Sequence, residues 1–102
     1  MASIIRLTTP TIKYGFKVVK VSDIAKAYLT IKQDGTAIIE KDLNDATVGE
    51  KDLSWRFSQE ETKLMSIGKI TAMINWLLND GTRGASGKTV LLIDGNFKDE
   101  VI

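Results

Sequence analysis

The stretch Ala27-Tyr-Leu-Thr-Ile-Lys-Gln-Asp-Gly-Thr-Ala-Ile-Ile39 decides the fold class of this chain, because it has the pattern of two short strands around a turn. Apolar and polar residues alternate from position 27 to position 32, which is the period of a half-buried strand. The apolar set resumes at residues 37–39, after the turn residues Asp34 and Gly35. The stretch therefore predicts a β-hairpin and, with it, a small β domain.

The length of the hairpin loop decides which side chains share a face. A two-residue loop would place Leu29 opposite Glu40, so that a charged side chain would interrupt the apolar face. A three-residue loop over residues 33–35 places Leu29 opposite Ile39 and keeps that face apolar. The sequence thus predicts a three-residue loop closed by Gly35 in the left-handed region, with a bulge.

The remainder of the chain has the pattern of further short strands. Strands are predicted over residues 11–19, 25–43 (as the hairpin), 53–57, 70–78 and 89–93, with turn composition over 44–51. The segment Ser58-Gln-Glu-Glu61 matches a capping box, in which Ser58 accepts from the Glu61 N–H and Glu61 reaches back. It predicts a helix of one or two turns, ended by Ser66 and Gly68.

A second hairpin is predicted after the strand over residues 70–78. A turn at Asn79-Asp80-Gly81 would return the chain through the polar residues 82–88, which we expect to be bulged or partly loop. In that register even-numbered residues lie together. We therefore expect Val90 and Leu92 to share the face of Trp76.

Short strands, regular turns and the lack of a long helical pattern predict an all-β fold. The expected fold is an immunoglobulin-like β-sandwich of six to seven antiparallel strands with one short helical turn between strands, and a small open barrel is the alternative. The predicted inward set is Tyr14, Phe16, Leu29, Ile31, Ile39, Leu53, Trp55, Phe57, Ile74, Trp76, Val90 and Leu92.

The 102 residues predict a single domain over 1–102, with terminal segments at 1–9 and 95–102. The first residues lack the basic region, apolar stretch and cleavage site of a signal peptide. No apolar run approaches the roughly 20 residues of a membrane span. We therefore expect no membrane association and a protein that is cytoplasmic on synthesis.

Missing residue types exclude most catalytic chemistry. The chain has no Cys and no His, so thiolate nucleophiles, disulfides and His-based acid–base or metal chemistry are impossible within it. No pair of carboxylates stands out. The sequence predicts a protein that is not an enzyme, with no catalytic residue, no cofactor site and no metal site.

Two segments resemble ligand motifs and fail on inspection. Gly87-Lys88-Thr89 matches the end of a phosphate-binding P-loop, but the earlier glycine would have to stand at Thr82, and a β-favouring run follows where a helix is needed. Residues 94–100 have the oxygen ligands of a calcium loop, but Lys98 occupies a ligand position and the central glycine is missing.

The charge is unevenly divided along the chain. Residues 1–41 carry seven basic and three acidic side chains, a net +4, and residues 42–102 carry seven basic and ten acidic ones, a net −3. The basic residues of the first part are spread along predicted strands and lack interleaved exposed aromatics: Lys13, Lys17, Lys20, Lys26 and Lys32. We therefore expect no nucleic-acid binding. A second interpretation of the uneven charge is that the basic part of one copy contacts the acidic part of an identical copy, head to tail.

Three aromatic residues admit two interpretations. Trp55, Phe57 and Trp76 would form a sugar-binding platform if they were exposed, but their alternation with polar residues favours a place in the core.

Three segments carry a resemblance to a known family: Asp23 to Gly35, Ser58-Gln-Glu-Glu-Thr62 with Gly68-Lys69, and Asn75-Trp-Leu-Leu-Asn-Asp-Gly-Thr-Arg83. Together they resemble the small immunoglobulin-like domains of phage and prophage tail proteins, nearest to the N-terminal domain of phage baseplate upper proteins. The resemblance covers roughly residues 11–94. It implies a non-enzymatic sandwich without catalytic residues, associated with a virion. The sequence ends at Ile102 without a receptor-binding region, so a structural or adaptor part is expected.

The expected function is therefore a non-enzymatic phage or prophage structural or assembly protein of the tail or baseplate, with copies of itself or other tail components as partners. The alternative is a small carbohydrate- or surface-binding module. Apolar residues in the terminal segments, Ile4, Ile5 and Leu7 at one end and Phe97, Val101 and Ile102 at the other, predict self-association as a homo-oligomer. Packing of both ends on their own sandwich is the competing interpretation.

Overall fold

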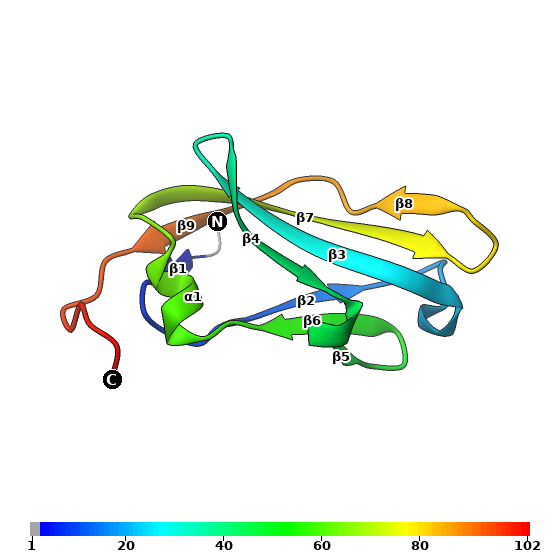
Figure 1. The fold of residues 1–102 in the computed structure, drawn as a ribbon, viewed down its shortest axis with the longest axis horizontal. Helices are drawn as coiled ribbons and strands as arrows, with labels where there is room; N and C mark the ends of the chain where they lie inside the picture. The colour runs from blue at the N-terminus through cyan, green and yellow to red at the C-terminus, as the bar shows by residue number, and fades with distance from the viewer. Residues whose placement is uncertain (1–2) are drawn as a thin grey trace.

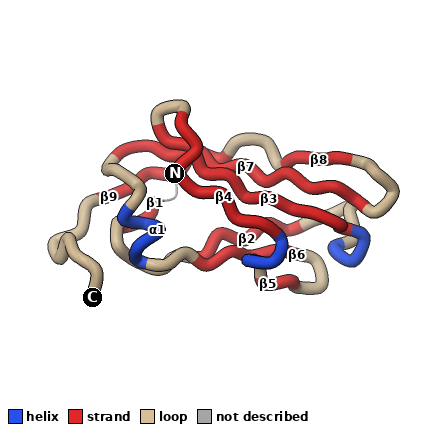
Figure 2. The backbone as a smooth tube through the Cα atoms, in the orientation of Figure 1, coloured by secondary structure: helices blue, strands red, loops and turns tan. Residues whose placement is uncertain are grey.

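The computed structural model describes residues 3–102, which form two stacked β-sheets with short helices at their ends (Figures 1 and 2). The elements in chain order are β1 (Ser3–Ile5), β2 (Thr11–Gly15), the 3-10 turn η1 (Val21–Asp23), β3 (Ile24–Gln33), β4 (Thr36–Asp42), the 3-10 turn η2 (Leu43–Asp45), β5 (Thr47–Val48), β6 (Asp52–Arg56), α1 (Gln59–Lys63), β7 (Gly68–Leu78), β8 (Arg83–Ala85) and β9 (Thr89–Asp94).

The larger sheet has the strand order β1-β9-β7-β3-β4, with β8 paired to β7, and the smaller sheet has the order β2-β6-β5. All pairs are antiparallel except β1 with β9, which is parallel. The predicted all-β sandwich is confirmed. Over residues 3–102 it has more strands than expected, because the short pairings of β1, β5 and β8 have no alternation long enough to be seen in the sequence.

The β3–β4 turn differs from the predicted loop. Asp34 and Gly35 have φ of 53° and 79°, and Gln33 pairs with Thr36, so a two-residue type I′ turn connects the strands. The predicted three-residue loop was wrong. The positive φ of Gly35 is confirmed. A bulge at Ile38 then shifts the pairing, so that Ile31 lies opposite Ile39. The bulge restores the shared apolar face that the longer loop was expected to provide.

The predicted face of β9 was wrong. Ile70 on β7 lies opposite Leu91, so odd-numbered residues of β9 point inward. Ile93 is buried, whereas Val90 is exposed and Leu92 is only partly buried. The turn at residues 79–81 forms as predicted but leads into β8, and residues 86–88 then shift the register by one. A shift of one residue turns every following side chain to the opposite face.

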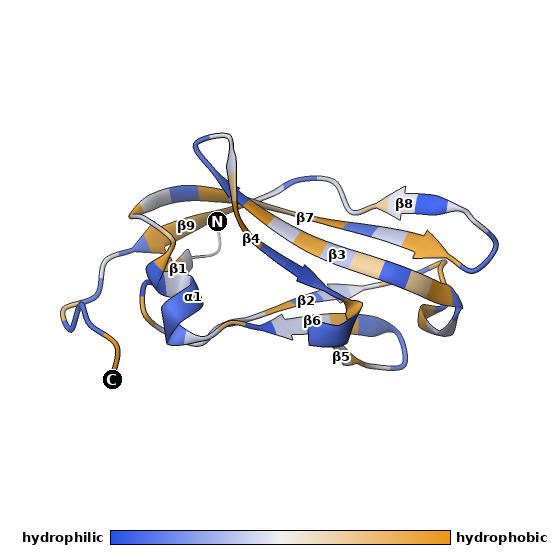
Figure 3. Cartoon of the chain, in the orientation of Figure 1, coloured by the Kyte–Doolittle hydropathy of each residue, from blue (hydrophilic) through white to orange (hydrophobic). Residues whose placement is uncertain are grey.

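The core lies between the two sheets. Alternation of apolar and polar residues along β3 is visible in Figure 3. Of the predicted inward set, eight side chains are buried: Phe16, Leu29, Ile31, Ile39, Leu53, Trp55, Phe57 and Ile74. Tyr14 and Trp76 are partly buried and pack against this cluster. The core also includes residues that the prediction left out: Ile4, Leu7, Val21, Ile24, Ala27, Met65, Ile70, Ala72 and Ile93.

The helix α1 is fixed by the predicted capping box. The Ser58 hydroxyl accepts from the Glu61 N–H at 3.1 Å, and the Ser58 N–H donates to Glu61 Oε1 at 2.9 Å. Glu61 also pairs with Lys41 of β4, with 2.8 Å between Oε2 and Nζ. The cap thereby ties the helix to the edge of the larger sheet.

Two boundaries differ from the prediction. The strand expected over 11–19 ends at Gly15, and Phe16 then donates its N–H to the carbonyl of Lys51 at 2.8 Å. The segment 44–51, expected to be a turn, also holds the two-residue strand β5. No helix within residues 3–102 is long and apolar enough to cross a membrane.

Candidate association surface

The part of the chain that the structure describes brings together no group of three acidic side chains that could hold a metal ion. Imidazole and thiolate ligands are missing from the sequence itself. Within residues 3–102, the candidate functional surfaces are exposed apolar and basic side chains.

Both rejected ligand motifs lie in ordinary backbone. The segment 84–89 runs through β8 and a loop into β9, a strand and not the helix that a P-loop requires. In the segment 94–100, the Asn96 side chain accepts from the Lys98 N–H at 3.1 Å and donates to the Arg6 carbonyl at 3.0 Å. Those contacts serve to fold the C-terminal segment back on the N-terminal one.

The three aromatic side chains do not form an exposed platform. Trp55 and Phe57 are fully buried, and Trp55 Nε1 donates to the Asp42 carbonyl at 2.9 Å. Trp76 is partly buried against Tyr14 and Phe16, with ring centroids 5.7 and 5.0 Å away. The core interpretation is confirmed for Trp55 and Phe57, and the sugar platform built on these three residues was wrong.

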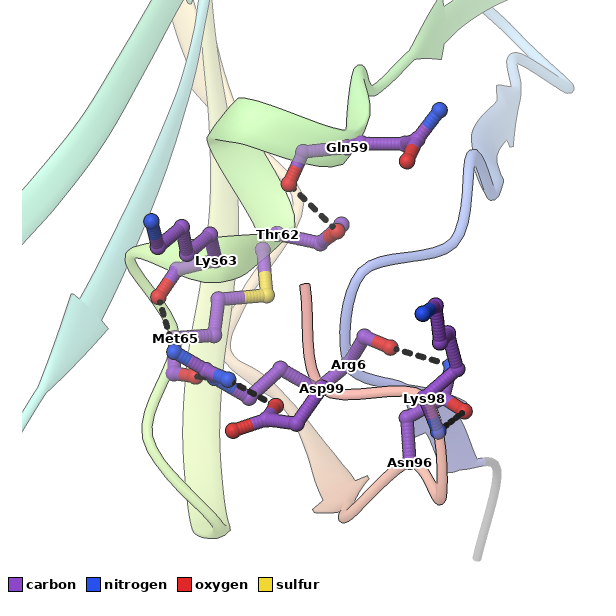
Figure 4. A network of polar contacts seen from close by, with 8 residues as sticks. All are labelled: Arg6, Gln59, Thr62, Lys63, Met65, Asn96, Lys98 and Asp99. Atoms are coloured by element: carbon purple, nitrogen blue, oxygen red, sulfur yellow. Dashed lines mark hydrogen bonds and ion pairs between the residues drawn. The ribbon is translucent and has the colours of Figure 1, made fainter. Parts of the chain in front are cut away.

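Arg6 anchors the C-terminal segment to the sandwich (Figure 4). Its guanidinium donates to the carbonyls of Met65 at 3.2 Å and Lys63 at 3.1 Å, and it pairs with Asp99. The last residue is held in addition: Gln59 Nε2 donates to the Ile102 carbonyl at 2.9 Å, and the Ile102 N–H donates to Gln59 Oε1 at 2.8 Å. The backbone of residues 95–102 is thus fixed by polar contacts to α1 and its flanks.

The apolar side chains of the same end remain in solvent. Phe97 is fully exposed and Ile102 is 85% exposed. Exposed apolar residues also flank α1 and end β1, which lie at this end of the molecule in Figure 1. We call this set the terminal apolar patch: Ile5, Leu64, Ile67, Phe97, Val101 and Ile102.

The N-terminal segment contributes little to that patch. Residues 3–5 form β1 alongside β9, and Ile4 and Leu7 are buried. The expectation of apolar surface at the N-terminal segment was therefore wrong for Ile4 and Leu7, and Ile5 alone of the three remains half exposed. Met1 and Ala2 lie outside the described residues.

The opposite end of the sandwich carries a smaller apolar surface. Residues 16–22 and 48–51 line an open concavity there. Val18 is 94% exposed and Val48 is 58% exposed. We call these two segments the loop end. It carries Lys17, Lys20 and Lys51 against the single carboxylate of Glu50, a net +2.

Comparisons with known proteins add to the fold and not to the function. No protein-family model matches the chain, and no curated protein does. Among solved structures, the chain is similar to CopC from Methylosinus trichosporium OB3b, with a TM-score of 0.60 over 93% of this chain and 86% of that one. Sequence identity is 17%. A likeness at that identity shows the fold alone, so the comparison supports a β-sandwich and nothing more about activity.

Proposed function

We propose that this protein is a non-enzymatic structural or assembly component of a phage or prophage tail, and that its sandwich associates with copies of itself or other tail components. The tail assignment rests on the sequence resemblance. The association rests on one observation, the exposed apolar side chains of Phe97 and Ile102 on a backbone that is itself held in place.

Exposure of those two side chains carries a free-energy cost that association removes. Burying an apolar side chain of this size is worth about 1.5–3 kcal/mol. Phe97 and Ile102 together would contribute about 3–6 kcal/mol to an interface, before the cost of association is subtracted. Because Gln59 and Arg6 already order the segment, less conformational entropy is lost on binding.

The loop end offers the matching surface. Its exposed valines, Val18 and Val48, are apolar, and its lysines give it a net positive charge. Residues 94–102 carry Asp94, Asp99 and Glu100 against one lysine, a net −2. We infer that the terminal apolar patch of one copy binds the loop end of the next. Such head-to-tail contacts build rings or open filaments.

Complementation of two variants tests this arrangement. Phe97→Ser/Ile102→Ser removes one surface and Val18→Ser/Val48→Ser removes the other, with Val90→Ser as a control on the outer sheet face. Light scattering of the wild type should show assemblies, and each double variant alone should be monomeric. Mixed together, the two variants should form a 1:1 dimer that cannot grow. A wild type that is monomeric at high micromolar concentration would refute the association, and a mixture that stays monomeric would refute the head-to-tail contact.

Genomic neighbours test the tail assignment separately. Tail, tape-measure or lysis genes beside the coding sequence would support it, whereas a metabolic operon would contradict it. A virion-associated location is expected only in the first case.

A further inference from the structure

We propose that the outer face of the larger sheet binds an extended anionic polysaccharide. This inference is independent of the assembly role, which uses the two ends of the molecule. If the protein is a surface-binding module, this face would be its binding site, in place of the aromatic side chains that lie in the core.

The outer face is hollowed along β3 and β7. A groove of about 580 Å³ has a lining that includes Thr30, Lys32, Lys69, Thr71, Asn75 and Lys88. Asn75 also lines a second hollow of about 170 Å³, together with Lys26, Tyr28, Trp76, Leu77 and Arg83. From residue 69 to residue 77 a strand rises about 26 Å. The two hollows share Asn75 and lie along a stretch of β7 that is long enough to contact several residues of a polymer.

Strand pairing brings the basic side chains of this face close together. Lys32 on β3 lies opposite Thr71 on β7, and Lys69 is two residues from Thr71 on the same face. Diagonal neighbours of this kind are about 7–8 Å apart. Lys88 precedes Thr89, which lies opposite Ala72, so it reaches the groove from the other side of β7. Basic side chains thus flank the strand on both sides.

The charge of this face is unbalanced. Within residues 3–102, none of its basic side chains, Lys26, Lys32, Lys69, Arg83 and Lys88, forms an ion pair within 4.0 Å. Among the residues that the structure describes, Asp34 is the one carboxylate that lines the groove, and Glu40 lies opposite Thr30 on β4. Unpaired ammonium groups around a floor of mixed polar and apolar side chains, Met73 among them, favour an anionic ligand with an apolar face.

The uncharged side chains distinguish a sugar polymer from other polyanions. Thr30 and Thr71 offer acceptors as well as donors, and the hydroxyl groups of a sugar can use both, whereas the oxygens of a phosphate chain use only the donors. Asn75 adds amide N–H donors, since its Oδ1 already accepts from Arg83 at 3.3 Å. Tyr28, 39% exposed and opposite Asn75, presents an aromatic ring beside them. One aromatic and a net charge of +1 are too little for single-stranded nucleic acid, which needs a dense basic surface with several stacking rings.

Calorimetric titration of the full chain with polygalacturonate at low salt tests the proposal. Lys32→Gln/Lys69→Gln/Lys88→Gln should weaken binding at least about tenfold. The control Lys13→Gln/Arg56→Gln/Lys63→Gln changes the net charge equally, uses three exposed basic residues on β2, β6 and α1 away from this face and from the loop end, and should retain the wild-type affinity. Equal losses in the two triple variants would overturn the proposal, because net charge alone would then explain binding.

A second arm separates the sugar from its charge. Tyr28→Ala and Thr71→Val should weaken binding of polygalacturonate severalfold and leave any binding of polyphosphate unchanged. Neutral dextran should bind much more weakly than polygalacturonate. No detectable binding of polygalacturonate, or equally tight binding of polyphosphate or single-stranded DNA with the same lysine dependence, would overturn the assignment of an anionic polysaccharide.

Discussion

Replacing Gly84 by alanine should destabilise the protein, because β8 lies directly on the indole of Trp76. Gly84 pairs with Trp76 across β7 and β8. A Cβ at Gly84 would lie 2.5, 2.5 and 2.6 Å from Cε2, Nε1 and Cζ2 of that indole. Tyr14 and Phe16 hold the ring from the core side, so it has little room to move away.

The sign of the effect follows from two opposing terms. Overpacking of this kind costs about 1–3 kcal/mol. Replacing glycine by alanine at an unstrained position stabilises the folded protein by about 0.4–1 kcal/mol, because the unfolded chain has fewer conformations to lose. A net destabilisation of about 1–2 kcal/mol is expected, with a fall in melting temperature of roughly 4–8 °C per kcal/mol for a domain near this size.

Urea unfolding followed by tryptophan fluorescence measures the change. Gly15→Ala is the matched control, since Gly15 also lies in a strand and its Cβ would meet nothing within 4 Å. That variant should be neutral or slightly more stable. Trp76→Leu should relieve the clash, so that its combination with Gly84→Ala costs at least about 0.5 kcal/mol less than the sum of the two changes. A Gly84→Ala variant as stable as the wild type would refute the packing argument.

Three further predictions concern the core, the hairpin and the cap. Trp55→Ala should lower the free energy of unfolding by about 3–5 kcal/mol, because the indole is fully buried. Trp76→Ala should lower it by less, because Trp76 is only partly buried, and denaturant titration of the two variants compares the losses. Gly35→Val should cost about 1–2 kcal/mol, since φ is 79° there, and Gly35→Asn should cost clearly less; equal losses would contradict the backbone argument. Burial opposes ionisation of Glu61, but the contacts with Lys41 and Ser58 outweigh it and lower the pKa of this carboxyl below 4.5. The stability that it contributes is therefore present above about pH 4.5 and lost as the pH falls through the lowered pKa, and Glu61→Gln should remove that part of the pH dependence of unfolding.

Much of the fold could be predicted because it depends on local pattern. The alternation around Leu29 and Ile31, the capping box at Ser58 and the turn at residues 79–81 all appear in the structure at the predicted places. Each depends on residues within a few positions of one another. The candidate surfaces were harder to predict, since Lys32, Lys69 and Lys88 are far apart in sequence and come together only through the pairing of β3, β7 and β9.

By itself, the sequence determined the class of this protein: an all-β sandwich without His or Cys, with a β3–β4 hairpin whose turn needs Gly35 at positive φ. Only the tertiary structure decided the registers. The bulge at Ile38 and the break at residues 86–88 each shift one strand by a single residue, and a single residue decides which side chains face the core. The tertiary structure also decided that Ile4 is buried and Phe97 is exposed. The N-terminal segment pairs with β9 as a parallel strand, whereas the C-terminal segment is held by the side chains of Arg6 and Gln59. Such pairings join residues some 90 positions apart, and local alternation carries no record of them.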